Sequence, residues 1–250
     1  MSKNFELMQQ AGIEVERERT TSLVQRDANS HPSKIGFAQD QVTREESLKL
    51  VQRLFLGQDA KRPRAVVFAG IDPGNGCTRL CGDTARVLAE NVPGSVCIVE
   101  ANLRAPLLAQ FFGVTNHWGL TDALLKEGPI RSFAKQVYRD NLWLLSCGSP
   151  TPTAQFPNLL SSEQLKMRFA ELRKEFDYIL VDVPPLNQYA DATALGQITD
   201  GVVLVVEANS TRKESALKAL ETLRGAQIEI LGAVLNKRTF PIPESLYRRL

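Results

Sequence analysis

The stretch AVVFAGIDPGNGCT, residues 65–78, decides the fold. It opens with a short apolar run, passes through a turn that holds Gly74 and Gly76, and enters residues 78–91, where apolar side chains recur at helical spacing. A glycine-rich turn between a strand and a helix lets consecutive backbone N–H groups converge on an anion, and the N-terminus of the helix adds its dipole. We therefore expect a phosphate-binding turn at this point.

The turn departs from the nucleotide-binding pattern GxxxxGK[ST] in its charge. It keeps glycines and the hydroxyl residue Thr78, but Cys77 stands where the pattern has lysine. Taken by itself, the sequence fits a tight turn without a ligand as well as it fits a phosphate site. Two later segments favour the phosphate site.

Apolar runs and amphipathic segments alternate from residue 65 onward. Continuous apolar strands separated by helices indicate a parallel sheet that is covered on both faces. The expected fold class is therefore α/β, a mostly parallel sheet flanked by helices, with ligands beyond the carboxyl ends of the strands. The strand candidates are residues 65–69, 96–99, 142–145, 178–181, 202–206 and 228–235. The helix candidates are residues 78–91, 120–126, 161–176, 190–198 and 211–226.

Composition divides the chain into three parts. Residues 1–41 are polar, carry dispersed charges and have no sustained apolar period, which predicts a mobile extension. Residues 42–238 form the expected globular domain, which a helix over residues 42–56 introduces. Residues 239–250 form a short C-terminal tail.

Composition and charge also exclude several classes of protein. Of the 250 residues, 43% are hydrophobic and 23% are charged, and the net charge is +2. These values exclude general disorder and give no reason to expect nucleic-acid binding. No apolar run approaches the roughly 18 to 20 residues of a membrane span, so we expect a cytoplasmic protein.

The cysteines do not suggest a metal site or a disulfide framework. Cys77, Cys81, Cys97 and Cys147 have no paired CxxC spacing, and buried free thiols are expected for the last three. Cys77 at a helix N-terminus also suggests a reactive thiolate. The histidines, His31 in the extension and one in a predicted loop at position 117, do not favour a catalytic Cys–His pair.

Polar side chains follow two of the later apolar runs. Glu100 and Asn102 come after residues 96–99 and would share one face of a continuing strand, and Arg104 could then reach a phosphate. Asp182 comes after residues 178–181 and could hold Mg²⁺ through a water molecule.

The three segments, in this order, resemble the Walker A, Walker A′ and Walker B motifs of the bacterial tyrosine autokinases of the CpsD/CapB type, which serve capsule and exopolysaccharide synthesis. The similarity spans residues 43–238 and continues through GLTDAL at 119–124, LLSCG at 144–148 and LGAVLN at 231–236. It implies the P-loop NTPase fold of the septum-site and partition ATPases.

The resemblance also implies a role for each matching residue. The implied contacts to ATP or ADP are Gly74, Asn75, Gly76, Cys77, Thr78, Arg104 and Asn236, the last of these against adenine. The implied Mg²⁺ ligands are Thr78 and Asp182, and the catalytic positions are Asp182, Glu100 and Asn102.

Three positions depart from the family pattern in ways that weaken the chemistry. Cys77 replaces the loop lysine, and Glu100 and Asn102 replace two aspartates. A charged hydrogen bond contributes about 1.5–3 kcal/mol, so its loss at Cys77 should weaken nucleotide binding about ten- to a hundredfold. Asn102 cannot accept a proton, so nucleotide binding is expected to survive better than phosphoryl transfer.

Two further features are also degraded. The family's oligomerisation pattern ExxRxxR reads Glu46, Lys49 and Gln52 here, and the tail has Tyr247 alone instead of a tyrosine cluster. Apolar residues such as Leu246 suit the tail to docking on a surface. We therefore expect that Tyr247 is not phosphorylated by the protein itself.

These features predict an exopolysaccharide or capsule biosynthesis protein that binds ATP or ADP with Mg²⁺ weakly and regulates a membrane polysaccharide co-polymerase. That partner would place it at the inner face of the plasma membrane, and a homo-oligomer remains open. One alternative is an active, atypical tyrosine autokinase. The other is a partition-type positioning ATPase, which is disfavoured because that class uses a lysine where Asp72 stands.

Overall fold

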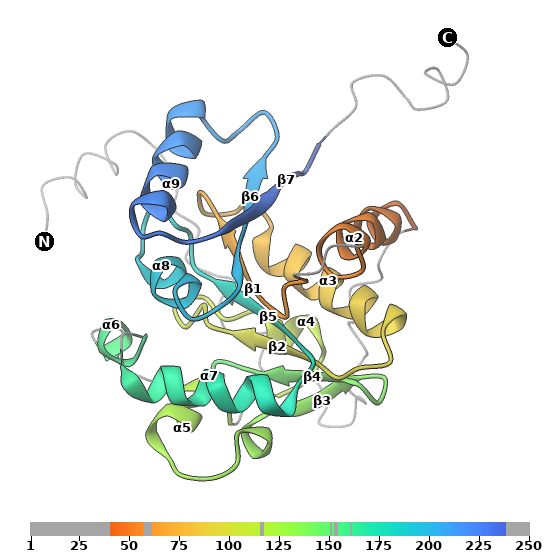
Figure 1. Cartoon of the computed structure of the whole chain (residues 1–250), viewed down its shortest axis with the longest axis vertical. Helices are drawn as coiled ribbons and strands as arrows, with labels where there is room; N and C mark the ends of the chain where they lie inside the picture. The colour runs from red at the N-terminus through yellow and green to blue at the C-terminus, as the bar shows by residue number, and fades with distance from the viewer. Residues whose placement is uncertain are drawn as a thin grey trace, which may run out of the picture. The chain divides into compact units, whose positions relative to one another are not determined.

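A seven-stranded sheet forms the centre of the computed structural model, which describes residues 41–57, 62–115, 118–150, 152, 155–160 and 162–238. Its strands are Ala65–Gly70 (β1), Val96–Glu100 (β2), Lys135–Tyr138 (β3), Leu142–Leu145 (β4), Tyr178–Val183 (β5), Gly201–Glu207 (β6) and Ile230–Asn236 (β7). Their order in the sheet is β3-β4-β2-β5-β1-β6-β7 (Figure 1). All neighbouring strands are parallel except the antiparallel pair of β3 and β4, so the predicted α/β class is confirmed.

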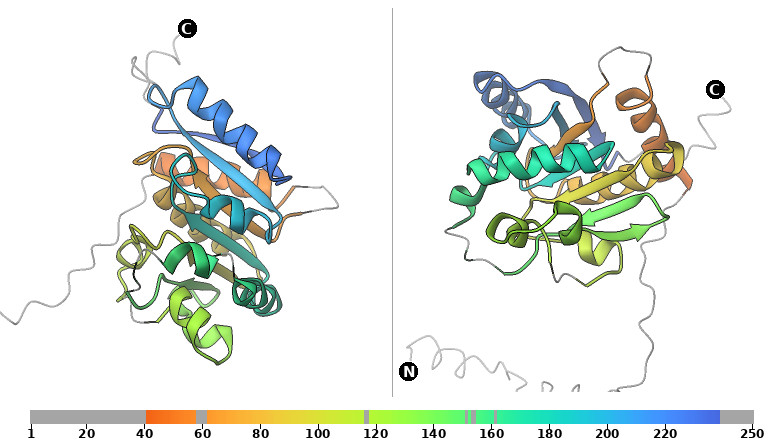
Figure 2. Two further views of the ribbon diagram at one scale, coloured as in Figure 1. Left: turned by 90° about the vertical axis from the view of Figure 1, so that its left-hand side faces the viewer. Right: turned by 60° about the horizontal axis from the view of Figure 1, so that its bottom comes forward.

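Helices cover both faces of the sheet. The main ones are Gln41–Leu54 (α2), Cys77–Asn91 (α3), Leu120–Leu125 (α5), Glu163–Glu175 (α7), Asp191–Gly196 (α8) and Lys213–Gly225 (α9). Short helical segments are Leu108–Phe111 (α4), Ile130–Phe133 (η1) and Phe156–Leu160 (α6). Figures 1 and 2 show α2 and α3 on one side of the sheet and α7, α8 and α9 on the other.

Strand β1 shows why the sheet needs both helical layers. Ala65, Val67 and Ala69 pack in the hydrophobic cluster that contains residues of α5, α7, α8 and α9. Val66 and Phe68 point the other way, into the cluster formed with α2, α3 and α4. Successive side chains of a strand face opposite sides, so a strand buried on both faces is apolar throughout. Continuous apolar runs predicted six of the strands, and this rule explains the fully buried ones among them, such as β1 and β2.

The structure corrects the prediction at one edge of the sheet. Strand β3 was not predicted, because Lys135 and Gln136 are exposed and the strand breaks its register with β4 after Gln136. The short segments α4, η1 and α6 were also missed. Strand β7 begins at Ile230, two residues later than the apolar run suggested.

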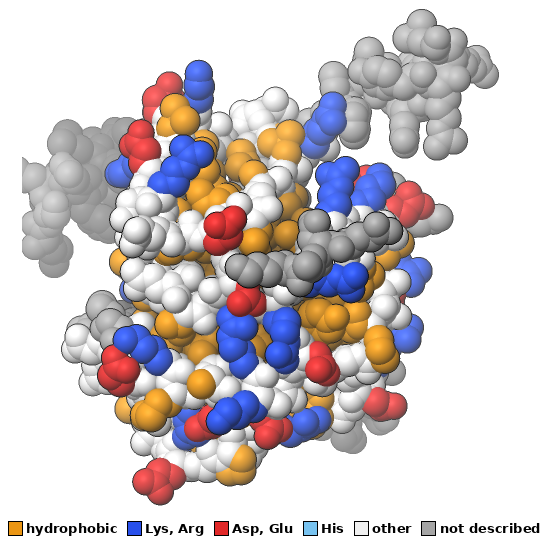
Figure 3. Space-filling view, in the orientation of Figure 1, with side chains coloured by type: hydrophobic (Ala, Val, Ile, Leu, Met, Phe, Trp, Pro, Cys, Tyr) orange, Lys and Arg blue, Asp and Glu red, His pale blue; other side chains and the backbone are white. Residues whose placement is uncertain are grey.

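The proposed extension and tail cannot be compared with the structure. Residues 1–40 and 239–250 lie outside the described residues, and so do His31, His117 and Tyr247. Within the part that is described, no helix has the length and apolar character needed to cross a bilayer. Basic and acidic side chains are interspersed over the face drawn in Figure 3, as the net charge of +2 suggests.

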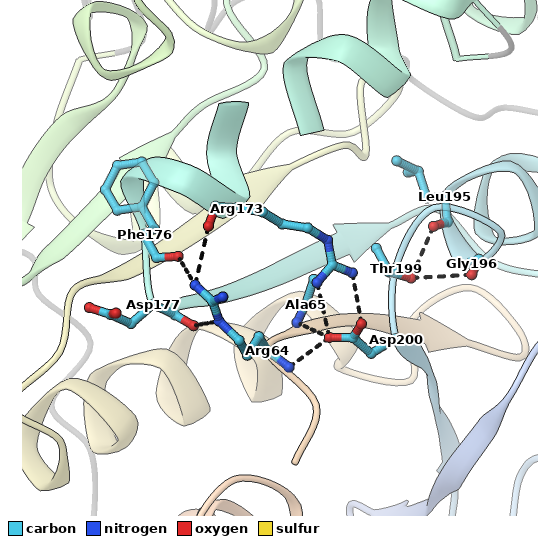
Figure 4. A network of polar contacts seen from close by, with 9 residues as sticks. All are labelled: Arg64, Ala65, Arg173, Phe176, Asp177, Leu195, Gly196, Thr199 and Asp200. Atoms are coloured by element: carbon cyan, nitrogen blue, oxygen red, sulfur yellow. Dashed lines mark hydrogen bonds and ion pairs between the residues drawn. The ribbon is translucent and has the colours of Figure 1, made fainter. Parts of the chain in front are cut away.

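A polar network ties together the amino ends of β1, β5 and β6 (Figure 4). The backbone N–H groups of Arg64 and Ala65 both donate to Asp200 Oδ2, at 2.7 and 2.8 Å. Arg173 donates to the other oxygen of Asp200 at 2.8 Å. The Arg64 guanidinium donates to the carbonyls of Arg173 and Phe176, which the end of α7 would leave without partners. The candidate site lies at the opposite edge of the sheet, at the carboxyl ends of the strands.

Candidate functional site

A cavity of about 540 Å³ opens at the carboxyl ends of β1 and β5. Ligands bind at this edge in open parallel sheets, so its position agrees with the sequence-based expectation. The predicted site residues that line it are Gly74, Asn75, Gly76, Cys77, Thr78, Asn102 and Arg104. Glu100, Asp182 and Asn236 do not line the cavity but lie behind residues that do.

The loop between β1 and α3 has the backbone conformation of an anion-binding turn. Gly74 and Gly76 both have φ of 81°, in the left-handed region that favours glycine. A Cβ at Gly76 would lie 2.6 Å from Asn236 Nδ2, so this position also requires glycine for space. Helix α3 begins at the next residue, Cys77, and points its positive end at the loop.

The Asn75 side chain accepts a hydrogen bond from one backbone N–H group of this loop, that of Cys77. It is 3% exposed, its Nδ2 donates to Val205 O at 3.0 Å, and its Oδ1 accepts from Cys77 N at 3.1 Å. Gly70 makes room for it, because a Cβ there would overlap the Asn75 amide. A phosphate that needs the Cys77 N–H must therefore compete with Asn75 Oδ1.

Thr78 and Asp182 form the oxygen pair expected at a magnesium site. Thr78 Oγ1 donates to Asp182 Oδ2 at 2.8 Å, and Asp182 Oδ1 is buried without a hydrogen-bond partner. Burial, together with the nearby charge of Glu100, raises the pKa of Asp182 to about 7, against the lowering effect of the Thr78 and Cys77 hydrogen bonds. Hydroxyl and carboxylate oxygens are ligands that Mg²⁺ accepts, so these residues fit the ion once Asp182 is ionised.

Cys77 does not have the properties of a reactive thiolate. Its side chain is 8% exposed and faces Asp182. Burial and the Asp182 charge raise the pKa of the Cys77 thiol well above its ordinary value, which keeps the thiol protonated. A protonated thiol is a poor nucleophile and brings no positive charge to a phosphate.

Glu100 and Asn102 do not share one face of a strand, which corrects the expectation drawn from their spacing. Strand β2 ends at Glu100, so the alternation of side chains does not extend to Asn102. Glu100 is fully buried and accepts hydrogen bonds from Leu108 N at 2.5 Å and Cys147 N at 3.1 Å. Burial raises its pKa, while the backbone donors act in the opposite direction. The carboxylate thus holds two loops in place and stays out of the cavity.

Asn102 and Arg104 reach the cavity, but both have partners within the chain. Asn102 Oδ1 accepts from Ala105 N at 3.3 Å. Arg104 Nη1 lies 2.6 Å from Asp191 Oδ1, and its guanidinium stacks 4.0 Å from the centre of the Tyr189 ring. Tyr189 was missed as a cavity residue, because it follows a strand in a polar loop that has no motif. A phosphate at this position would have to share the Arg104 guanidinium with Asp191.

Asn236 supports the loop from its other side. Its Nδ2 donates to Asn75 O at 2.8 Å, which holds that carbonyl away from the cavity. The predicted contact of Asn236 with adenine stays a prediction.

No family model matches the chain, but individual proteins do. Tyrosine-protein kinase YwqD of Bacillus subtilis is 32% identical over 176 residues, which make up 70% of this chain and 73% of YwqD. The succinoglycan biosynthesis transport protein ExoP of Rhizobium meliloti is 27% identical over 175 residues, which make up 70% of this chain but 22% of ExoP.

Solved structures share the fold. The kinase domain of Escherichia coli tyrosine kinase ETK superimposes with a TM-score of 0.74 at 20% identity, over 97% of this chain and 98% of that domain. A chain of the MinC:MinD cell division protein complex of Aquifex aeolicus superimposes with a TM-score of 0.58 at 20% identity, over 74% and 72%. The predicted P-loop NTPase fold is confirmed.

Proposed function

Because the chain belongs to the bacterial tyrosine autokinase family of the CpsD/CapB type, we propose that it is a weakly nucleotide-binding regulatory protein of exopolysaccharide or capsule synthesis. The observation that carries this proposal is the combination of backbone conformation and side chains in the glycine loop between β1 and α3. The backbone conformation of a phosphate site is present, while the residue that should bring the phosphate-binding cation is a buried, protonated cysteine.

Several contacts support nucleotide binding at this cavity. Gly74 and Gly76 give the loop its anion-binding conformation, and the start of α3 adds the helix dipole. Thr78 and Asp182 would hold Mg²⁺, which neutralises phosphate charge. Binding should strengthen as the pH rises through about 7, where the Asp182 carboxyl ionises.

Other features of the cavity argue against efficient phosphoryl transfer. Removal of one preorganised donor to a transition state costs about 10²–10³ in rate, and here the loop lysine is replaced by Cys77. Asn102 cannot act as a base, and Glu100 is buried against backbone N–H groups. Arg104 is paired with Asp191. Of the three implied catalytic positions, Asn102 lines the cavity but carries no charge, while Glu100 and Asp182 do not line it.

Titration calorimetry with ATP and ADP, each with and without Mg²⁺ at pH 8, tests nucleotide binding. We expect dissociation constants in the micromolar-to-millimolar range, which is weak for a P-loop protein. An absence of heat at millimolar nucleotide would leave a purely structural loop and contradict the proposal.

An active, atypical autokinase is the second candidate, and the preserved Thr78–Asp182 pair favours it. Incubation with labelled ATP, followed by mapping of the label, separates the two. We expect no stoichiometric phosphate on Tyr247. Phosphate on Tyr247 that the variant Asp182→Ala abolishes would instead establish an active kinase.

The partner that we propose is a membrane polysaccharide co-polymerase, which would hold the protein at the inner face of the plasma membrane. The match to part of ExoP, a much longer transport protein, supports a functional association with such a protein. The test is binding to the cytoplasmic segment of a co-polymerase from the same organism, by the full chain and by a variant without residues 240–250. We expect the shortened chain to bind the partner more weakly or to self-associate more weakly than the full chain. Its affinity for nucleotide should not change. Equal binding by both proteins would contradict a docking role for the tail.

A further inference from the structure

Lys237 follows the last strand and returns its side chain to the glycine loop. Its Nζ donates to Gly74 O and lies 3.1 Å from Glu207 Oε1 at the end of β6. The residue is not part of any motif recognised in the sequence. Its contact with the backbone of the loop distinguishes it from an ordinary surface ion pair, which would contribute little.

The backbone of Lys237 is held in an unfavourable conformation. Its φ is 54°, in the left-handed region that residues with a Cβ rarely adopt. Such strain persists where the surrounding structure imposes it, and it is frequent at functional sites. Here β7 positions the residue on one side, and the Gly74 and Glu207 contacts hold the end of its side chain.

Two consecutive carbonyls of the loop are held from this side. Lys237 binds the carbonyl of Gly74, and Asn236 Nδ2 binds the carbonyl of Asn75 at 2.8 Å. In a planar trans peptide, the C=O of one residue and the N–H of the next point in opposite directions. The two contacts therefore orient the N–H groups of Asn75 and Gly76 away from Lys237 and Asn236.

We propose that Lys237 is a positioning residue for phosphate binding: by holding the Gly74 carbonyl it turns the amides of the loop toward the phosphates of a nucleotide. This inference rests on the proposed nucleotide binding and assigns part of it to a residue outside the loop. The ammonium group, paired with Glu207, lies beside a loop that has cysteine instead of lysine at position 77. Glu207 keeps this charge in position and does not remove its hydrogen bond to Gly74.

The test compares Lys237→Met with two matched variants of the full chain. Lys218→Met removes the same charge from an exposed lysine of α9, and Lys237→Arg keeps a cationic donor at the site. The ligands are Mg-ADP, Mg-pyrophosphate and adenosine, measured by calorimetry. We expect Lys237→Met to weaken the binding of ADP and of pyrophosphate about five- to tenfold, because the loop loses its charge-assisted contact with Lys237. Adenosine binding and the Lys218→Met variant should not change, and Lys237→Arg should recover most of the affinity.

Two results would overturn the inference. One is equal affinity of the wild type and Lys237→Met for ADP and pyrophosphate. The other is an equal loss for adenosine, which would make Lys237 a contact to the base. If the wild type binds none of these ligands, the proposed function fails by itself, and the amide NMR signals of the loop still decide the role of Lys237. The amide signals of Asn75 and Gly76 should then shift or broaden in Lys237→Met relative to the wild type and Lys237→Arg, and unchanged signals would refute the positioning role.

Discussion

The Thr78 hydroxyl donates a hydrogen bond to Asp182 Oδ2 at 2.8 Å, although 104 residues separate the two in the chain. Strands β1 and β5 are neighbours, with Phe68 in register with Asp182, so the helix that follows β1 begins beside the end of β5. The topology of the sheet thus brings a hydroxyl and a buried carboxylate together. This pair determines the first prediction.

Replacing Asp182 with asparagine should remove the effect of Mg²⁺ on nucleotide affinity. The amide keeps the size of the carboxylate but lacks the charge that holds a hydrated divalent cation. Calorimetry with ADP, with and without Mg²⁺ at pH 8, measures the difference. Asp140→Asn is the control, because it removes a carboxylate at an exposed position outside the cavity lining and should leave the Mg²⁺ effect intact. An Asp182→Asn variant with the full Mg²⁺ effect would place the ion elsewhere.

Restoring lysine at Cys77 should tighten the binding of Mg-ADP about ten- to a hundredfold, through a charged hydrogen bond to the phosphates. The matched variant Cys77→Met adds a chain of similar length without charge. If both variants change the dissociation constant equally, removal of the buried thiol is the cause and the charge is not.

Shortening Asn75 to alanine should strengthen the binding of pyrophosphate by about fivefold, since one neutral hydrogen bond contributes about 1 kcal/mol. The change frees the Cys77 N–H, which now donates to Asn75 Oδ1. Val205 O keeps a donor in Ile71 N, so the truncation leaves no unpaired carbonyl there. Weaker binding by Asn75→Ala would show that this side chain braces the loop more than it obstructs it.

Asp200 should make folding stability depend on acid pH. Burial favours a higher pKa for this carboxyl, but Arg173 and the backbone N–H groups of Ala65 and Arg64 outweigh burial and hold the pKa below its usual value. A lowered pKa stabilises the fold above the ordinary value of 3.8, and this contribution is lost as the pH falls through the folded-state pKa. The Asp200→Asn variant should lose about 1–3 kcal/mol of the free energy of unfolding at pH 7.

Urea unfolding at pH 7 and at pH 3 measures this effect. The difference between the wild type and Asp200→Asn should shrink at pH 3, because the stabilisation that the lowered pKa brings decreases as the pH falls below 3.8. Asp140→Asn, at an exposed position, is the control and should be neutral at both pH values. A difference that stays constant between pH 7 and pH 3 would mean that the charge of Asp200 is irrelevant.

The central strands were predictable because a parallel strand buried on both faces is apolar along its whole length, as β1 is. Strand β3 was not, because an exposed edge strand such as Lys135–Tyr138 carries polar residues and its pairing depends on its neighbour. The glycine loop could also be predicted from the sequence, because its left-handed backbone conformation favours glycine at positions 74 and 76.

The sequence by itself determined the order of the strands along the chain, the conformation of the glycine loop and the loss of its lysine, because these depend on residues close to one another. Tertiary structure alone decided that Glu100 is a buried anchor, that Asp191 holds Arg104 and that Lys237 reaches Gly74. Each of these contacts joins a side chain to a group that lies far away in the sequence. Their partners are set by strand register and helix packing, which no local pattern encodes.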